Sequence, residues 1–280
     1  MKPLLLLLLL NLSSLFAQTP QDSIALHQHP WQIQPLSKGI IWKWVHFQQA
    51  DLFKANESVN VLEIPYRSRQ WRIATADSLH KKDKTKGQLR PTSQLGKENQ
   101  AFAAINGGFF DVKNGGSVDF VKINNQITDT TRAKVGEKAT FHGQAAIVIN
   151  RGRLKILKGA DKVGWEYHLP YKNVLLSGPL LLLNGAKEIL PKNAFNDNRH
   201  PRSCMCITYD KKVLLITVDG RSASSSGMNL AELTFLVQQL NCRDAINLDG
   251  GGSTTLWLAE KGVVNYQATT SVLIMKARGP

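Results

Sequence analysis

A carboxylate, Asp249, separates an apolar run from a stretch of small residues made of Gly250, Gly251, Gly252, Ser253 and Thr254. Consecutive glycines let the backbone approach a ligand without intervening side chains. Successive free amides in such a loop form a cradle for an anion, and phosphate is the anion that this arrangement favours. A plain hinge or tight turn is the alternative interpretation of the same residues.

A second carboxylate, Asp219, also follows an apolar run and precedes a glycine and a cation, Gly220 and Arg221. Two carboxylates in one cleft are typical of glycoside hydrolysis, in which one protonates the leaving oxygen and the other attacks carbon or activates water. The alternative is that each Asp-Gly pair forms a common turn in which Asp caps backbone amides.

A third segment runs from Asn106 through Gly107, Gly108 and two phenylalanines to Asp111. It combines an amide, two glycines and a carboxylate with aromatic rings that could stack on a sugar. One of the two phenylalanines is expected to belong to the core instead.

Arg202 enters a predicted strand directly after His200 and Pro201. Its planar guanidinium group matches the oxygens of a phosphate, and a surface ion pair is the alternative. His200 has the chemistry of a general acid or base, but a lone histidine beside a proline favours a structural role.

Many short strand-like runs bounded by turn residues must position these side chains. Strands are predicted over residues 40–47, 59–64, 71–75, 101–105, 145–149, 154–157, 174–176, 180–183, 205–209, 213–218 and 245–248. One helix is predicted over about 230–241, because Asn229 and Glu232 form a capping-box pair and apolar residues then recur at helical spacing.

The strands at 213–218 and 245–248 flank this helix, and such a crossover could make them parallel neighbours. Asp219 and Asp249 would then follow the carboxyl ends of both strands, where ligands collect in open α/β sheets. The predicted fold class is α+β: a single domain with a mixed, strand-rich sheet and at least one covering helix.

Residues 1–17 indicate an export signal, because Lys2 precedes an unbroken apolar stretch too short to span a bilayer and the small Ala17 follows. No later run has the apolar length of a transmembrane helix. No cysteine lies near Ala17, so a lipid anchor is not indicated. The mature protein is therefore expected outside the cytoplasm, in the periplasm or secreted.

The formal net charge of +14 indicates an anionic partner, and many cations lie between residues 67 and 97. The lysine-rich part at 81–86 favours a solvated loop, because it has no interleaved aromatic residues to stack on bases. Nucleic acid is therefore not expected as a partner.

Cys204, Cys206 and Cys242 allow at most one disulfide. Cys204 and Cys206 would point to the same face of a strand and are poorly placed to bridge each other, whereas either could pair with Cys242. Neither the spacing nor the count is typical of a zinc site, and buried free thiols are the favoured interpretation.

Together, these motifs resemble those of the phosphodiester glycosidase family. The resemblance extends from about residue 59 to the C-terminus and is carried by residues 105–110, Ser177-Gly178-Pro179, Pro201-Arg202, Asp219-Gly220-Arg221, 227–230 and 247–254. It implies an exported hydrolase acting on a sugar joined through its anomeric carbon to phosphate, either an α-N-acetylglucosamine-1-phosphodiester or a bacterial phosphoglycan. The expected organisation is a signal peptide at 1–17, a strand-containing segment at 18–58 and a catalytic domain at 59–280.

For such a substrate, Asp249 is the first candidate for nucleophile or base, and Asp219 is the second. The phosphate is expected to be held by charged side chains, loop amides and hydroxyls, which belong to Arg202, Arg221, Gly250, Gly251, Gly252, Ser253 and Thr254. The other predicted substrate-binding residues are Asn106, Gly107, Gly108, Asp111, Gly178 and Asn247. Asn106 and Asn247 would bind sugar hydroxyls or an acetamido group.

Asp219, Asp249 and Asn247 are hard oxygen donors suited to calcium or magnesium, although no spacing in the sequence requires a metal. Two other functions fit the same residues. One is a non-catalytic protein that binds phosphoglycans, and the other is a phosphodiesterase that cuts the bond between phosphorus and oxygen.

Overall fold

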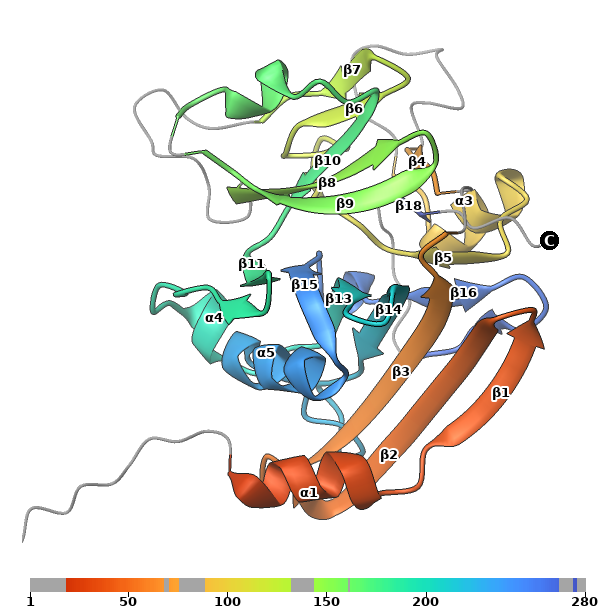
Figure 1. Cartoon of the computed structure of the whole chain (residues 1–280), viewed down its shortest axis with the longest axis vertical. Helices are drawn as coiled ribbons and strands as arrows, with labels where there is room; N and C mark the ends of the chain where they lie inside the picture. The colour runs from red at the N-terminus through yellow and green to blue at the C-terminus, as the bar shows by residue number, and fades with distance from the viewer. Residues whose placement is uncertain are drawn as a thin grey trace, which may run out of the picture.

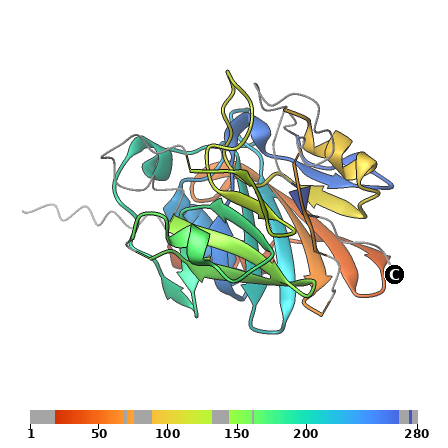
Figure 2. The ribbon, with the colours of Figure 1, turned by 90° about the horizontal axis from the view of Figure 1, so that it is seen from above.

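The computed structural model describes residues 19–67, 71–75, 89–131, 144–160, 162–266 and 274–275. These residues form three layers: a small sheet lies above a large sheet, and helices lie below the large sheet (Figure 1). Seen from above, the small sheet overlies the strands of the large one (Figure 2). The expected export signal at 1–17 and the lysine-rich run at 81–86 lie outside the described residues.

The large sheet is antiparallel throughout its pairings. Its strands, in pairing order, are β1 (Gln32–Ser37), β2 (Ile40–Leu52), β3 (Ala55–Pro65), β14 (Lys212–Val218), β13 (Arg202–Thr208), β15 (Cys242–Asn247), β11 (Leu180–Leu183) and β12 (Ala186–Lys187). The α+β class is confirmed, with antiparallel rather than mixed pairing in the described strands. Residue 58, the expected end of the N-terminal segment, lies inside β3, so β1 and β2 belong to the same sheet as the candidate site.

The strands that precede Asp219 and Asp249 are not neighbours, and that prediction was wrong. β14 and β15 run in the same direction, but β13 lies between them and is antiparallel to both. The end of β14, the end of β15 and the beginning of β13 therefore meet at one edge of the sheet. Arg202, the first residue of β13, is thereby placed between the two carboxylate loops.

Smaller sheets and helices complete the described fold. The five-stranded sheet contains, in pairing order, β7 (Gln126–Asp129), β6 (Val121–Ile123), β10 (Asn173–Ser177), β8 (Ala145–Asn150) and β9 (Arg153–Lys158). The two other sheets are formed by β17 (Gly262–Val263), β16 (Leu256–Leu258) and β5 (Ala103–Ile105), and by β18 (Ile274–Met275) with β4 (Ile73–Ala74). The helices are α1 (Pro20–Gln28), α3 (Thr92–Glu98), α4 (Ala194–Asp197) and α5 (Leu230–Gln239), and short 3-10 turns cover η2 (Trp165–His168) and η3 (Gly251–Ser253).

Helix α5 begins where its sequence predicts. The Asn229 side chain accepts a hydrogen bond from the Glu232 amide, and the Glu232 carboxylate accepts one from the Asn229 amide. Both groups of this capping box satisfy backbone donors that the first helical turn would otherwise leave unpaired.

Each face of the large sheet is buried in its own core. Side chains such as Leu62 and Ile246 pack against the smaller sheets, whereas their neighbours Val61 and Ala245 pack toward α1 and α5. Successive residues of a strand point to opposite faces, so strands covered on both faces are apolar at nearly every position. The polar side chains at the strand ends are the exceptions that form the site.

Cys206 and Cys242 form a disulfide that joins β13 to β15, with 5.8 Å between their Cα atoms. Cys204 remains a buried free thiol. The expectation that all three would be free thiols was therefore wrong, and pairing with Cys242 was the correct alternative. Because Cys206 and Cys242 lie on neighbouring strands, their Cβ atoms point to the same face at bonding distance.

Candidate active site

Glycine contacts bring three loops together at the edge of the large sheet. A Cβ atom on Gly220 would lie 2.9 Å from the Gly227 Cα and from the Pro201 nitrogen, and one on Gly227 would lie 2.5 Å from the His200 carbonyl carbon. His200 and Met228 also exchange backbone hydrogen bonds. Any larger residue at 220 or 227 would therefore separate the loop of Asp219 and Arg221 from the loop that precedes β13.

The Asp249 loop docks on the same place. The Gly251 amide donates to the Pro201 carbonyl at 2.8 Å, and a Cβ atom on Gly250 would lie 2.6 Å from that oxygen. On its other side, the Asp249 amide donates to the Gly107 carbonyl at 2.8 Å. The backbone of Asp249 is thus fixed by two separate segments, while the residue itself remains half-buried.

Asn106 and Asn247 are buried behind this loop. The Asn106 side chain donates to the Asp249 carbonyl and accepts from Ser203 Oγ and the Thr255 amide. Asn247 Nδ2 donates to two carbonyls, those of Gly178 and Leu248. Both residues are 0% exposed, so they position the loop in this structure. The expected contact of their amides with a sugar stays a prediction.

Asp219 is buried and held by a segment that the sequence did not single out. Its Oδ1 accepts from the Tyr266 amide at 2.9 Å and from Asn265 Nδ2 at 3.2 Å. Asn265 also bonds the Thr254 carbonyl and the Leu256 amide, so it links Asp219 to the chain that follows the Asp249 loop. Burial raises the pKa of Asp219, while the hydrogen bonds and the nearby His46 oppose this shift. A carboxyl group of this kind is suited to hold a proton.

Arg221 is the exposed cation of the cluster. Its backbone is left-handed, with φ of 59°. Its Nη2 lies 3.4 Å from His200 Nδ1, and its guanidinium group lies against Gly251, 3.2 Å from the place where a Cβ atom would be. Burial, Arg202 and Arg221 lower the pKa of His200, which favours the neutral ring that can accept from Arg221.

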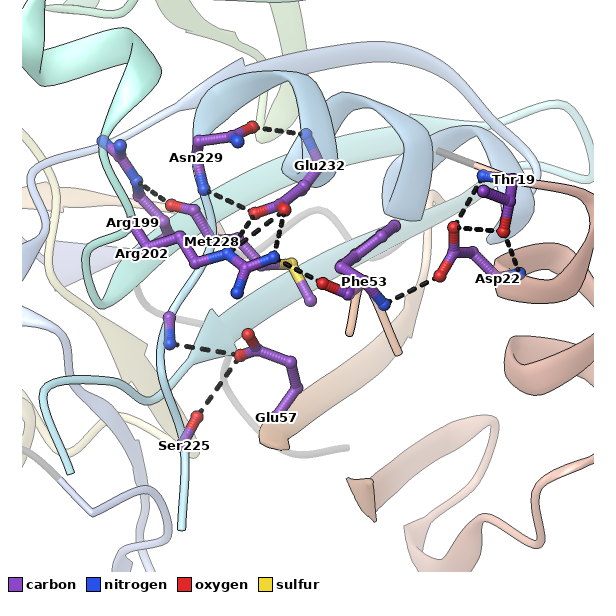
Figure 3. A network of polar contacts seen from close by, with 11 residues as sticks. Thr19, Asp22, Phe53, Glu57, Arg199, Arg202, Ser225, Met228, Asn229 and Glu232 are labelled. Atoms are coloured by element: carbon purple, nitrogen blue, oxygen red, sulfur yellow. Dashed lines mark hydrogen bonds and ion pairs between the residues drawn. The ribbon is translucent and has the colours of Figure 1, made fainter. Parts of the chain in front are cut away.

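Arg202, by contrast, is 1% exposed, and Figure 3 shows its hydrogen bond to Met228. Its Nε donates to the Met228 carbonyl, and its Nη2 donates to the carbonyls of Phe195 and Asn198. The guanidinium carbon also lies 4.8 Å from the centre of the Phe195 ring. Burial lowers its pKa to about 10, partly opposed by Glu232. Arg202 therefore ties loops together, which differs from the expected direct contact with phosphate.

A buried carboxyl, Glu57, lies beneath the same loops and was missed by sequence reasoning (Figure 3). Its Oε2 accepts from the Gly227 amide at 3.2 Å and from Ser225 Oγ at 3.4 Å, and Ser225 Oγ donates to the Asp219 carbonyl. Burial raises the pKa of Glu57 to about 8; Arg199 lowers it, and Glu232 adds to the rise. Glu57 stands in a strand with no neighbouring sequence motif, so only the fold reveals it.

Two backbone amides of the expected phosphate cradle already form hydrogen bonds within the protein. The Gly250 amide donates to Asp249 Oδ1, and the Gly251 amide is taken by Pro201. Thr254 is 0% exposed, and its Oγ1 has no hydrogen-bond partner in the described part of the chain. Gly250 and Gly251 therefore serve close packing here, whereas the Arg221 side chain is exposed and open to an anion.

Asp111 and the phenylalanines have structural surroundings. Asp111 Oδ1 accepts from the amides of Lys113 and Asn114, as in an ordinary turn. The Phe109 ring packs edge-on against Phe195, with 5.8 Å between ring centres. Gly108 packs where a Cβ atom would lie 3.1 Å from the Leu175 side chain.

No group of three or more His, Cys, Asp or Glu side chains that could hold a metal occurs among the described residues. A role for calcium or magnesium stays a prediction, which activity measured after exhaustive chelation would test. Within the same residues, no helix combines the length and the apolar composition needed to cross a membrane.

Comparison with known proteins identifies the family of these loops. Residues 99–277 match the family model described as phosphodiester glycosidase, a span that includes Asn106, Asp219, Arg221 and Asp249. The chain belongs to the phosphodiester glycosidase family.

Three solved structures share the fold of this phosphodiester glycosidase family member. The zebrafish N-acetylglucosamine-1-phosphodiester alpha-N-acetylglucosaminidase catalytic domain, auto-inhibited by its pro-peptide, is 17% identical with a TM-score of 0.67 over 92% of this chain and 93% of that one. A hypothetical protein from Synechocystis is 15% identical, with a TM-score of 0.63 over 88% of this chain and 63% of that one. A putative exported protein from Burkholderia pseudomallei K96243 is 13% identical, with a TM-score of 0.56 over 81% of this chain and 75% of that one.

One curated relative matches a shorter stretch. The SPbeta prophage-derived uncharacterized protein YomE of Bacillus subtilis strain 168 is 37% identical over 67 residues, which are 24% of this chain and 10% of that protein. The chain thus spans a small part of YomE. β1, β2 and β3 precede the span that matches the family model, so Glu57 lies outside that match although it supports the loops inside it.

Proposed function

We propose that this protein is an exported glycosidase that hydrolyses a sugar-1-phosphodiester. The observation that carries the proposal is the convergence of the loops at 200–202, 219–221, 227–228 and 249–253, which gathers two carboxylates and an exposed arginine. The family match supports it, and so does the zebrafish glycosidase domain, whose named substrate is an N-acetylglucosamine phosphodiester. An α-N-acetylglucosamine-1-phosphodiester or a bacterial phosphoglycan fits this chemistry.

Arg221 binds the phosphate in this mechanism, because its guanidinium group is exposed and leans on Gly251 beside Asp249. Contacts to a phosphate that gains charge as it leaves stabilise the transition state more than the ground state. His200 orients Arg221 by accepting from its Nη2. Arg202 contributes by holding the loop from which His200 and Pro201 project.

Asp249 acts at the anomeric carbon, either attacking it or taking a proton from the attacking water. The bond between that carbon and the phosphate oxygen breaks, and the phosphate leaves as a monoester anion. Asp219, whose pKa is raised by burial, holds the proton that the leaving oxygen can receive. Because a phosphate anion leaves readily, the contribution of Asp249 exceeds that of Asp219.

Export is supported by three observations. Residues 1–17 have the composition of a signal peptide, the protein contains a disulfide, and a similar structure is described as a putative exported protein. The periplasm or the extracellular medium is the proposed location.

Hydrolysis in ¹⁸O-enriched water tests the proposed reaction. With methyl N-acetylglucosamine-1-phosphate diester as the substrate, label in the released sugar supports the glycosidase. Label in the phosphate would show that the bond between phosphorus and oxygen is cut, and binding without any product would show a non-catalytic phosphoglycan-binding protein.

A further inference from the structure

Two tryptophans of β2 lie on the same face of the large sheet as Asp219. Across the sheet, Trp42 pairs with Leu62, Trp44 with Asn60 and His46 with Ser58. The Asp219 amide donates to the Ser58 carbonyl, so Asp219 lies across from Ser58 on one side, as His46 does on the other. Residues two apart on a strand share a face, and Trp42 packs against the core on the side of the smaller sheets. Trp44 and His46 thus follow Trp42 toward Asp219.

Trp44 is supported by an aromatic neighbour and keeps part of its surface in solvent. Its ring stacks on Trp42, with 4.1 Å between ring centres and 24° between planes. Trp42 is fixed by a hydrogen bond from Nε1 to Asn60 Oδ1. Trp44 belongs to none of the hydrophobic clusters formed by the described residues, and it is half-buried. A large, preordered ring with solvent beside it is a feature of ligand sites more than of cores.

The segment from Lys261 to Tyr266 runs alongside these rings and ends at Asp219. Lys261 Nζ lies 5.6 Å from the centre of the Trp42 ring, and the Tyr266 amide donates to Asp219 Oδ1. Tyr266 is 85% exposed. The tryptophans therefore form one side, and this segment the other, of a surface that leads to a candidate catalytic carboxylate. His46 and Ser58, joined by a 2.8 Å hydrogen bond, add polar groups at the end near Asp219.

We propose that Trp44, supported by Trp42 and flanked by His46 and Tyr266, binds a sugar ring of the glycan beyond the phosphodiester that is cut. An apolar face of a pyranose suits the indole ring, while the hydroxyls at its edge suit His46 and Ser58. The inference rests on the proposed function and deepens it, because a surface that extends past the reacting carboxylates fits an oligomeric phosphoglycan better than a single sugar phosphate.

The test compares binding of a short and a long ligand by titration calorimetry in the Asp249→Asn variant, which prevents turnover. The long ligand is a trimer of N-acetylglucosamine joined by 1-phosphodiester bonds, and the short one is the methyl diester of one unit. Trp44→Ala should weaken trimer binding about tenfold, the effect of about 1.4 kcal/mol of lost stacking, and leave the methyl diester unchanged. Trp44→Phe should keep most of the affinity.

Tyr209→Ala is the matched control, because Tyr209 is an aromatic residue 57% exposed at the opposite end of β14. The trimer affinity of the Tyr209→Ala variant should equal that of the parent. If Trp44→Ala lowers the melting temperature, His46→Ala provides a second variant for the same test. Equal trimer binding by the Trp44→Ala variant and the parent would overturn the inference, even where ¹⁸O labelling supports hydrolysis. Loss of trimer binding in that variant supports the surface, even where no diester is hydrolysed.

Discussion

Two arginines that are equally plausible phosphate ligands in the sequence have opposite surroundings in the structure. Arg202 is buried and donates to three backbone carbonyls, whereas Arg221 is exposed between His200 and Gly251. The buried Arg202 side chain has a structural role, because removing it would take a donor from three carbonyls. The Arg221 side chain makes few contacts within the protein and remains available to an anion.

Substitution should separate these roles. Arg202→Ala is expected to lower the free energy of unfolding by roughly 3 kcal/mol, because it removes a large buried side chain and the donor that it provides to three carbonyls. Arg221→Ala should keep the melting temperature and lower kcat/KM for a phosphodiester about tenfold or more, because it removes a charge-assisted contact that strengthens as the phosphate leaves. Urea unfolding and steady-state kinetics measure the two effects. An unchanged kcat/KM in a folded Arg221→Ala variant would remove Arg221 from phosphate binding.

Asp249→Asn should lower kcat about a thousandfold or more, because the amide can neither attack carbon nor accept a proton. The Asp249 backbone bonds to Gly107 and Asn106 do not involve the altered group, so the circular dichroism spectrum should be preserved. Asp111→Asn is the control, because Asp111 organises a surface turn and its loss should change kcat only a few-fold. Near-normal turnover by the Asp249 variant would transfer the catalytic role to Asp219.

Glu57 should make stability depend on pH. Its pKa is raised from 4.5 to about 8, so the folded state binds the proton more tightly than the unfolded state. This stabilisation is complete below about pH 4.5 and is lost as the pH rises through about 8. Arg199 opposes the shift and Glu232 adds to it. Glu57→Gln should therefore flatten the fall in the urea midpoint between about pH 4.5 and about pH 8, and equal slopes in both proteins would contradict it.

At the scale of elements, local patterns predicted what local forces determine. Helix α5 was predicted because its cap and its apolar spacing lie in one short stretch. Strands such as β8 and β14 were predicted because their apolar runs ended at turn residues, whereas short strands such as β6 and β16 were not predicted. The position of β13 between β14 and β15 was not predictable, since the pairing partner of an apolar strand is not encoded in its own pattern. Glu57 and Asn265 were not predicted as site residues for a related reason, because their partners lie far away in the chain.

The disulfide between β13 and β15 should stabilise the strands that lead to both sides of the site. It closes a loop with a sequence separation of 36 residues, which corresponds to about 4 kcal/mol on the chain-entropy argument. Replacing Cys206 and Cys242 together by Ala should lower the melting temperature, and a reducing agent should affect the parent but not this variant. Cys204→Ala is the control, because it removes a buried free thiol and keeps the disulfide, so it should respond to the reducing agent as the parent does.

At the scale of the whole molecule, the net charge of +14 should speed the encounter with an anionic glycan. Raising the salt concentration to about 0.5 M shortens the screening length to a few ångströms, so kcat/KM for a phosphodiester should fall about tenfold. The value of kcat should change little, because the contacts in the bound complex are short. Melting temperatures at each salt concentration exclude unfolding, and a salt-independent kcat/KM would show that the charge plays no part in capture.

The groups that hold Asp219 arrive late in the chain. Asn265 and Tyr266 follow Asp219 by 46 and 47 residues, and both come after Asp249. A ribosome that builds the protein from its N-terminus therefore delivers both carboxylates before the residues that fix one of them. The surroundings of Asp219 are therefore complete only when a segment that follows both carboxylates in the chain has folded back against it.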